Sequence, residues 1–589
     1  MPWGMAQWSP ANQADATAGW WFQSGSTHLA GVRCTHHPSP WHNDYGFFNV
    51  MMHVVNPQHD GKTGQYANYD PRVSTFRPYL FKAVLTPYGT AHGVATIEAT
   101  STVHGGILRF TFPPPDAGLL AGSYNATRRV YISVRATRGN SVHIDGNGTA
   151  ASPLLFTGVS TDAIPANGQF YFAASLLGAG GSTPITPLSW GQGQDGNNLW
   201  AWVDFNPADP AAEVLVMRAA TSFISAQQAL AAHTVEVASE SFDSAMATAK
   251  SAWHAIGTKI NVTDAGAGRS DAETTDLITT FYSALYRASK FPRSLWEVDY
   301  ANGGVPIHWS PYKGTVLPGV LSSDVGFWDA YRTTFSLLSL VQPAHLAEEM
   351  EGFLNCWREN GVMPQWPSPA GGGMAGTMSD VAFAEAIVKL PHCGTTRAAA
   401  AGYCVNASAL YAASRQNAFS RASDYYQYGY IPYESGGTMV SDTLLNYHCD
   451  WAVAQAATVL GHTDDAAILL ARGNNFTALL DPSRGFMVPR LRNGSFIADF
   501  DEFAWGPDPG YTEAGPWQYR MEAPQNPQGL KSALSAIGLD GCAVIQQANT
   551  MLPTYHAGGY GSVIHEQAEM AANCEEEMCP CTTPPTREP

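Results

Sequence analysis

The chain has 589 residues, and 45% of them are hydrophobic while 14% are charged, so there is material for large cores. With 31 Lys and Arg against 49 Asp and Glu, the net charge of −18 argues against nucleic-acid binding and against attachment to anionic lipid. No membrane segment is expected, because the most apolar stretch, 398–413, is too short to span a bilayer and contains Asn406. At about 150 residues per domain, the length predicts two to four globular domains.

Residues 1–235 are predicted to form β-strands separated by turns. The stretch 94–100 alternates apolar and polar side chains with a period of two, and 107–112 follows after two glycines. Later stretches of the same character are 130–134, 170–173, 199–203 and 213–217. Successive strands without intervening helices predict an antiparallel β-sandwich.

The remainder of the chain has helical character. Residues 236–270 are interpreted as a helical linker, and the helical period dominates from Asp271 onward. Helices are predicted around 277–285, 335–341, 346–354, 452–460, 464–472 and 474–480. Helices joined by long loops rich in Gly and Pro suggest an (α/α)6-type toroid over 271–574. Residues 575–589 are polar and rich in proline, and they are expected to be disordered.

Sequence motifs point to the secretory route. Six N-glycosylation sequons begin at Asn125, Asn147, Asn261, Asn406, Asn475 and Asn493. The nine cysteines lack metal-binding spacing apart from Cys579 and Cys581, and they are compatible with an oxidising compartment. We expect a secreted protein or one in the secretory-pathway or lysosomal lumen, although the first ten residues do not resemble a signal peptide.

Two clusters in the helical half could bind a sugar. In the first, Trp328 precedes Asp329, and Arg332 follows three residues later. The indole could stack on a sugar ring while the carboxylate binds hydroxyls, but an ion pair at a helix start explains the same spacing. The second cluster, 363–380, combines Trp366 with dense glycine, which permits close backbone approach to a ligand or forms a flexible surface loop.

A third cluster, 501–520, contains Glu513 among Trp and Tyr residues. An apolar environment raises a carboxyl pKa and produces a general acid, which glycoside hydrolysis combines with a second carboxylate. Taken alone, a Glu in a turn is more often a cap or a surface charge. The scattered His28, His36, His37 and His308 are expected to be structural when considered without a family.

In this order, the clusters resemble glycoside hydrolase family 92, the calcium-dependent exo-α-mannosidases. The resemblance covers roughly residues 1–574, and the ordered series is more specific than any single motif. Its main segments are Pro2–Pro10, His28–Gly31, Gly326–Arg332, Met363–Trp366, Asp450–Trp451 and Tyr511–Tyr519.

This resemblance implies a β-sandwich packed on an (α/α)6 barrel. It also implies inverting removal of terminal α-linked mannose, often α-1,2-linked, from N-glycans or mannans. Mannose-containing glycans or glycoproteins are therefore the expected partners. Glu513 matches the family's general acid. The matching candidates for substrate binding are Trp328, Asp329, Arg332, Trp366, Trp517, Gln518 and His28. The implied cofactor is calcium, a hard cation that engages sugar hydroxyls.

The chain departs from the family pattern in several places. The calcium-binding Gly-Asn-Glu-Pro-x-x-His region and the general-base segment would follow Cys574, where the resemblance stops, so we assign no metal ligand. The family's Thr-Glu-Gly-Asn also reads Thr-Glu-Ala-Gly at 512–515. We expect a chain truncated at both ends, an incomplete toroid and little or no activity. The alternatives are a non-catalytic carbohydrate-binding remnant and a glucoside hydrolase of another (α/α)6 family.

Overall fold

The computed structural model describes residues 1–12, 22–39, 42, 44–55, 67–86, 95–113, 127–137, 139–162, 164–165, 168–263, 270–369 and 371–544. The predicted tail at 575–589 and the sequon at Asn125 lie outside these residues. The chain forms two compact units. Unit 1 comprises Met1–Val325 and Pro367–Gly372, and unit 2 comprises Gly326–Trp366 and Gly373–Pro589. In the structure, residues 236–325 therefore belong to the same unit as the strands. The boundaries predicted at 235 and 270 rest instead on a change in the hydrophobic periodicity of the sequence.

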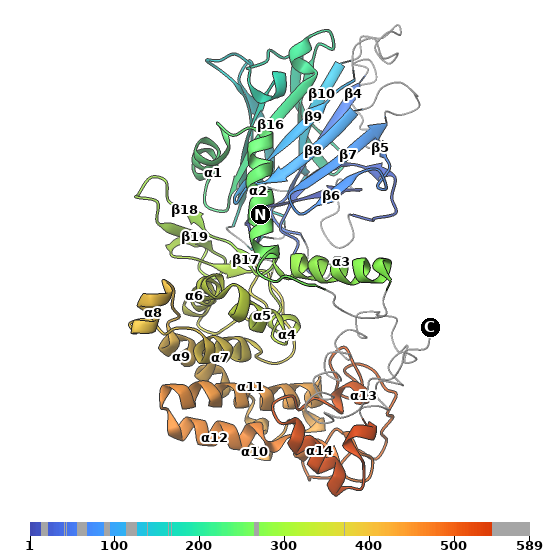
Figure 1. Cartoon of the computed structure of the whole chain (residues 1–589), viewed down its shortest axis with the longest axis vertical. Helices are drawn as coiled ribbons and strands as arrows, with labels where there is room; N and C mark the ends of the chain where they lie inside the picture. Colours follow the sequence, from blue (N-terminus) through green and yellow to red (C-terminus); the bar gives the residue numbers. More distant parts are fainter. Residues whose placement is uncertain are drawn as a thin grey trace. The chain divides into compact units, whose positions relative to one another are not determined.

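Unit 1 contains two antiparallel sheets (Figure 1). One has the order β1 (Gln7–Ala11), β3 (Gly31–Thr35), β4 (Phe48–Val55), β10 (Thr127–Arg135), β15 (Asn198–Phe205), β14 (Ser189–Asp195). The other has the order β11 (Ser141–Asp145), β12 (Leu154–Ser160), β13 (Phe170–Leu177), β16 (Val214–Ser222), β9 (Gly105–Thr111), β8 (Ala95–Ser101), β7 (Leu80–Thr86), β5 (Ala67–Tyr69), β2 (His28–Leu29), with β6 (Thr75–Arg77) on β7. The stacked rings of Phe48 and Phe172, one from each sheet, are 4.3 Å apart. The predicted sandwich is confirmed.

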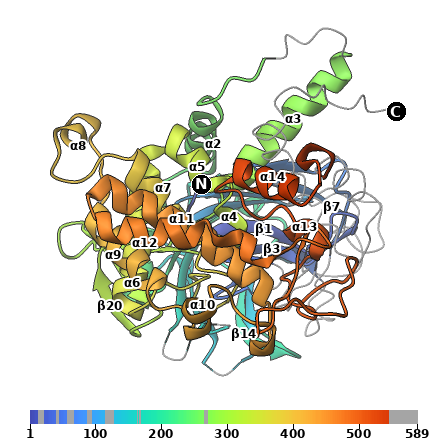
Figure 2. The same ribbon diagram turned by 90° about the horizontal axis from the view of Figure 1, so that it is seen from below.

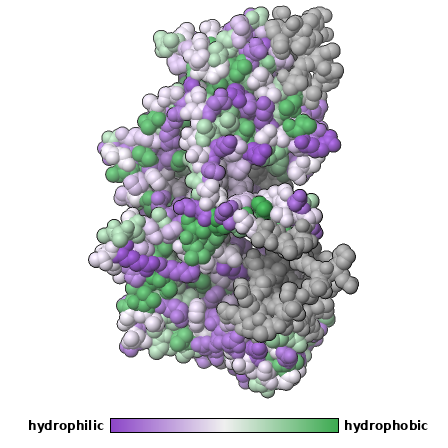
Figure 3. Space-filling model, viewed as in Figure 1, coloured by the Kyte–Doolittle hydropathy of each residue, from purple (hydrophilic) through white to green (hydrophobic). Residues whose placement is uncertain are grey.

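Three α-helices and several short strands are also present among the described residues of unit 1. The helices are α1 (Ala226–Ala232), α2 (Phe242–Gly257) and α3 (Asp271–Ala288). Helix α2 lies along β8 and β9 (Figure 1) and buries Phe242 against Ile107. The apolar stripe of α3 is only partly covered, because Leu285 is buried while Leu277 is 53% exposed, and Figure 3 shows mixed hydropathy over this helix. The short strands are β17 (Arg293–Ser294), β18 (Glu297–Val298), β19 (Pro306–Ser310), β20 (Thr315–Pro318) and β21 (Ser322–Ser323).

Unit 2 is helical, as predicted. Its helices are α4 (Phe327–Ala330), α5 (Thr334–Val341), α6 (Pro343–Asn360), α7 (Ser379–Lys389), α8 (Thr396–Ala401), α9 (Ala407–Ala418), α10 (Ser423–Tyr428), α11 (Met439–Leu460), α12 (Thr463–Gly473), α13 (Pro516–Tyr519) and α14 (Pro527–Ala536). The expected helix at 474–480 is instead a 3₁₀ turn, Asn475–Leu479, followed by β22 (Leu480–Asp481). Here Leu480 becomes extended and pairs with Met487 of β23 (Phe486–Met487).

Helix α11 forms the centre of unit 2. It is buried along most of its length and packs against α7, α9 and α12, and Figure 2 shows it beside α12. A helix that is buried on nearly all sides belongs in a core, and its buried polar groups must be paired there. The described helices have the expected (α/α)6-type arrangement and do not close into a barrel. Among them, none combines the length and apolar character needed to cross a membrane.

Unit 2 also buries a charge cluster around Arg421. Its guanidinium donates to Asp450 Oδ1 (2.9 Å), Asn446 Oδ1 (2.7 Å) and Thr377 Oγ1 (2.8 Å), and it lies 3.5 Å from Asp380. Both aspartates are fully buried. A buried charge is tolerated only when it is paired and hydrogen-bonded, so Arg421 compensates carboxylates that would otherwise destabilise the fold.

Replacing Arg421 with Met is expected to destabilise the protein by about 3–5 kcal/mol, because it removes the cation beside both buried aspartates and leaves Asp450 paired with Arg472 alone. The matched control is Arg358→Met, which removes an ion pair with Glu351 that is partly exposed on both sides and is expected to cost less than about 1 kcal/mol. Urea unfolding followed by tryptophan fluorescence measures both. Equal losses in the two variants would show that burial does not strengthen the Arg421 cluster.

In unit 1, Glu297 of β18 is a fully buried carboxyl. Its Oε1 accepts a hydrogen bond from the Phe223 backbone N–H at 2.7 Å. Burial raises the pKa of Glu297 to about 7, against the weaker lowering effects of neighbouring hydrogen bonds and of His104. The folded protein therefore binds a proton at this position over a pH range in which the unfolded chain has released it.

This difference predicts a pH dependence of stability. The pKa of Glu297 is raised from 4.5 in the unfolded chain to about 7 in the folded protein. The contribution of this group to folding stability is therefore complete below pH 4.5 and is lost as the pH rises to 7. The loss is on the order of 3 kcal/mol. In Glu297→Gln this slope should disappear, so the variant should gain stability relative to the unsubstituted protein between pH 5 and pH 8. Urea unfolding at both pH values tests this, and an unchanged difference would contradict it.

Candidate functional site

Helix α4 places Trp328 and Asp329 near Arg332. The Trp328 ring is buried, and the Arg332 guanidinium lies 5.4 Å from its centroid. Arg332 Nη1 also donates to the Trp328 carbonyl at 3.0 Å. Arg332 thus stabilises α4 through the Trp328 carbonyl and ring. The side chain of Asp329 is exposed on unit 2. Part of the Asp329 side chain is therefore accessible to a ligand, whereas the Trp328 ring is buried.

Gly326 allows Asp329 and Trp366 to approach the same backbone position. A Cβ atom on residue 326 would lie 2.2 Å from Asp329 Oδ2 and 2.4 Å from Trp366 Cζ3. Both distances are far below van der Waals contact. The first two sequence clusters, one containing Asp329 and the other Trp366, therefore meet at Gly326.

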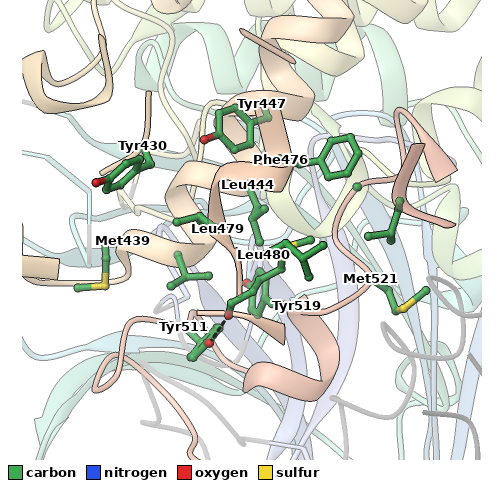
Figure 4. Close-up of a cluster of buried hydrophobic side chains, with 14 of the residues drawn as sticks. Tyr430, Met439, Leu444, Tyr447, Phe476, Leu479, Leu480, Tyr511, Tyr519 and Met521 are labelled. Carbon is green, nitrogen blue, oxygen red and sulfur yellow. Dashed lines mark hydrogen bonds between the residues drawn. The ribbon is translucent and has the colours of Figure 1, made fainter. Parts of the chain in front are cut away.

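The loop that contains Glu513 is anchored in the core of unit 2. The Tyr511 hydroxyl donates to the Met487 carbonyl at 2.6 Å, and the Tyr519 hydroxyl donates to the Thr512 carbonyl at 3.0 Å. Both rings belong to the buried cluster of Figure 4, which also includes Leu444 of α11. Between these anchors the Glu513 side chain is exposed. The loop is thus anchored in the core at both ends, and it exposes the Glu513 side chain between them.

The backbone at Glu513 is in the left-handed region, with φ of 46°. This region is unusual for residues other than Gly and Asn, and it persists only where the surroundings enforce it. A hydrogen bond of the preceding residue helps to hold this backbone conformation, because the Thr512 N–H donates to Ser441 Oγ of α11 at 2.8 Å. The position of the Glu513 side chain is therefore set by the tertiary structure.

Asp329 and Glu513 interact electrostatically. The pKa of Asp329 is raised to about 6, first by burial of its carboxyl and second by the negative charge of Glu513, while Arg332 opposes the rise. The carboxyl is thus crowded by protein atoms although part of the side chain stays accessible. The structure brings together two carboxylates that lie far apart in the sequence, and this is the electrostatic centre of the candidate site.

The remaining predicted residues lie in different surroundings. Trp517 is buried, and its ring packs edge-on against Phe486 at 5.0 Å. Gln518 is buried and its Oε1 accepts from the Gly515 N–H at 3.0 Å, which caps α13. These contacts support the Glu513 loop, and direct sugar contacts of the two residues remain predictions. The exposed side chain of His28 lies on β2 of unit 1, and its role also remains a prediction.

Sequence reasoning missed Glu522. Its buried carboxyl accepts a hydrogen bond from the Tyr331 hydroxyl at 3.4 Å and lies 4.0 Å from Arg332 Nη2. Burial raises the pKa of Glu522, and Arg332 opposes this effect. Glu522 therefore connects the end of the Glu513 loop to the element containing Arg332. The only sequence signal is a charged residue in an otherwise apolar stretch, 521–523.

Three cavities formed by the described residues are not lined by these carboxylates. Their volumes are about 590, 430 and 430 Å³. Among the described residues, no group of three or more His, Cys, Asp or Glu side chains could hold a metal ion.

Two protein-family models match this chain. Residues 1–222 match the glycosyl hydrolase family 92 N-terminal domain, and residues 228–537 match the glycosyl hydrolase family 92 catalytic domain. The chain belongs to glycosyl hydrolase family 92. The hydrolase from another (α/α)6 family is therefore excluded, and the helices of unit 2 belong to the family's catalytic domain.

Solved structures of family 92 resemble this chain over nearly its whole length. The inverting mannosidase BT2199 from Bacteroides thetaiotaomicron VPI-5482 is 25% identical, with a TM-score of 0.76, and the match covers 97% of this chain and 73% of that protein. The α-mannosidase BT3965 from Bacteroides thetaiotaomicron is 21% identical, with a TM-score of 0.74 and coverage of 98% and 75%. BT3965 is also known in complex with mannoimidazole. A comparison with curated proteins finds no match.

Gly326→Ala is expected to disturb the family 92 site without unfolding the chain. The added methyl group must displace Asp329 or the less movable Trp366 ring, and a shift near 1 Å in a catalytic site costs about 10²-fold in rate. The control is Gly373→Ala, whose Cβ meets Gln365 Oε1 at 3.5 Å, an ordinary contact. The measurement is kcat/KM for glycoside hydrolysis, with the melting temperature recorded in parallel. Equal kcat/KM for the two variants would contradict the crowding at Gly326.

Proposed function

We propose that this chain removes terminal α-linked mannose from N-glycans or mannans by inverting hydrolysis. The linkage that we propose is α-1,2. Membership of family 92 makes it a glycosidase, and the 25% identity to an inverting mannosidase supports mannose as the substrate. The observation that carries the proposal is the accessible Glu513 carboxyl, held by a core-anchored loop within electrostatic range of Asp329.

In this proposal Glu513 is the general acid. It protonates the glycosidic oxygen while the bond to the anomeric carbon breaks, and a water molecule attacks that carbon from the opposite face. Asp329 has a pKa of about 6, so it is mostly ionised at neutral pH and can accept hydrogen bonds from sugar hydroxyls. Trp328, which precedes Asp329, and Trp517 and Gln518, which follow Glu513, are buried and so pack these chain segments into the protein.

An inverting mechanism also requires a general base, with the two carboxyl groups about 6.5–9.5 Å apart. We assign no base among the described residues. The described residues also include no group of three or more His, Cys, Asp or Glu side chains that could hold the calcium ion that the family implies. No step is therefore derived through calcium.

We further propose that the protein works in an oxidising compartment of the secretory route. The disulfide between Cys393 and Cys404 supports this, because structural disulfides persist in such compartments and are rare in the cytosol. The sequon at Asn406 begins two residues after this disulfide and has an exposed side chain, which is compatible with the same route.

Glu513→Gln tests the proposed acid. Hydrolysis of α-1,2-mannobiose should fall by about 10²–10⁴-fold, because the amide cannot protonate the leaving oxygen. Glu502→Gln, the same change in the same loop, should leave the rate nearly unaltered. Proton NMR of the first product should show β-mannose if the reaction inverts the anomeric configuration. Assays with added calcium and with a chelator would show whether the metal contributes. Equal activity of the two variants would refute the role of Glu513.

A second candidate function is carbohydrate binding without turnover. The observation that favours it is the lack of an assigned base among the described residues. Isothermal titration calorimetry with α-1,2-mannobiose distinguishes the two functions, since heat of binding without product formation supports the binding protein. Product formation that depends on Glu513 supports the hydrolase.

A further inference from the structure

Unit 1 contains a groove that the proposed hydrolase does not use. Its volume is about 590 Å³, and it lies between the C-terminal end of α2, the segment that follows it, α3 and the turn before β7. Pockets that hold small organic molecules measure roughly 300–1,000 Å³, so the groove can accommodate a sugar ring. Three aromatic side chains contribute to its wall, namely Tyr79, Trp253 and Tyr282.

The aromatic side chains are held in place and are partly accessible. All three are half-buried. Trp253 packs against the Tyr286 ring at 4.9 Å, and the Lys250 ammonium lies 5.8 Å from the centre of the Tyr79 ring. Rigid aromatic faces bind the C–H faces of sugars with little loss of side-chain entropy. The groove thus has the chemistry of a carbohydrate platform.

Asn261 also lines the groove, and it begins the sequon Asn261-Val262-Thr263. The Tyr282 hydroxyl holds the backbone on both sides of it, donating to the Ile260 carbonyl at 2.9 Å and accepting from the Val262 N–H at 3.4 Å. The Asn261 side chain is exposed, and within the described residues its amide has no hydrogen-bond partner. An acceptor asparagine is therefore fixed at the rim of an aromatic groove, and no described residue engages its amide nitrogen.

Two other sequons have different surroundings. Asn475 lines a second aromatic cavity, but its Nδ2 donates to the Gly429 carbonyl at 3.1 Å, so its amide nitrogen is engaged. Asn147 is exposed in the turn between β11 and β12, and it does not line the groove of Asn261. Asn147 is therefore a matched control, because it shares the Asn-x-Thr motif and the exposure of Asn261 but not the aromatic wall.

We propose that Asn261 carries an N-linked glycan whose first N-acetylglucosamine residues occupy this groove and stack on Trp253 and Tyr79. The donor is an oligosaccharide linked to a lipid pyrophosphate. Asn261 Nδ2 forms the bond to C1 of the first sugar, the bond from C1 to the pyrophosphate oxygen breaks, and the amide loses one proton. Lipid pyrophosphate is the leaving group. The glycan is a permanent part of unit 1 and is distinct from the substrate of the hydrolase.

Site occupancy is the first test. The full chain is directed into the secretory pathway of yeast, and its glycopeptides are analysed by mass spectrometry. Asn261 should be occupied in nearly all molecules and Asn475 in few. An unoccupied Asn261 in secreted protein overturns the proposal. Because occupancy does not depend on hydrolysis, its failure is distinguishable from failure of the proposed mannosidase.

Thermal stability tests whether the attached sugar fills the groove. Endoglycosidase H leaves one N-acetylglucosamine on the asparagine. The trimmed protein should have the same melting temperature as the intact glycoprotein. Asn261→Gln should melt about 1–2 °C lower, since the sugar–aromatic contact is lost. Asn147→Gln should leave the melting temperature unchanged. Equal melting temperatures for Asn261→Gln and the intact protein overturn the proposed contact.

A double-mutant cycle separates the contact from a general effect of Trp253 on folding. In a Trp253→Ala background, removing the Asn261 glycan should change the melting temperature by less than half as much as in the original protein. Tyr79→Ser provides a second background that leaves the Trp253–Tyr286 packing intact. An undiminished effect in both backgrounds overturns the stacking. Calorimetric binding of free chitobiose to Asn261→Gln in this groove, with Asn261 unoccupied in the secreted original protein, would identify a receptor for external sugars and would also overturn the proposal.

Discussion

The attachment of the Glu513 loop to the core of unit 2 is the interaction on which the candidate site depends. Tyr511 and Tyr519 each place a ring in the buried cluster and use the hydroxyl to bind a backbone carbonyl. An aromatic residue that buries its ring and satisfies its hydroxyl contributes both packing and orientation. The strained backbone at Glu513 is sustained by these anchors, so an accessible carboxyl can be held where an unanchored loop would move.

The carboxylates of the core and those of the candidate site differ in burial and pairing. Around Arg421 the carboxylates are buried and paired, which satisfies their charge and leaves little capacity for another partner. Asp329 and Glu513 are accessible and share the same sign, so each benefits from a ligand that donates hydrogen bonds. Glu522 lies between these extremes, because it is buried but acts on Arg332 beside the site. This contrast is the reason that we locate function at the exposed pair.

Much of the fold could be predicted because its signals are local. Alternation with a period of two identified β8, and the helical period identified α12. The prediction was wrong at 474–480, where an apolar run of helical appearance becomes a 3₁₀ turn and a strand. The strand forms because Leu480 pairs with Met487 across a turn, and strand pairing depends on a partner that periodicity does not describe.

For the site, the sequence alone determined which residues could act, since the ordered motifs singled out Glu513 and Asp329 and the resemblance supplied their expected roles. Only the tertiary structure decided that their charges interact, that Trp328 and Trp517 are buried, and that Glu522 lies beside Arg332. It also decided that Asn261, one sequon of six, lines an aromatic groove. The physical reason is that residue type and spacing specify chemistry along the chain, whereas burial and Coulomb interaction depend on distances through space.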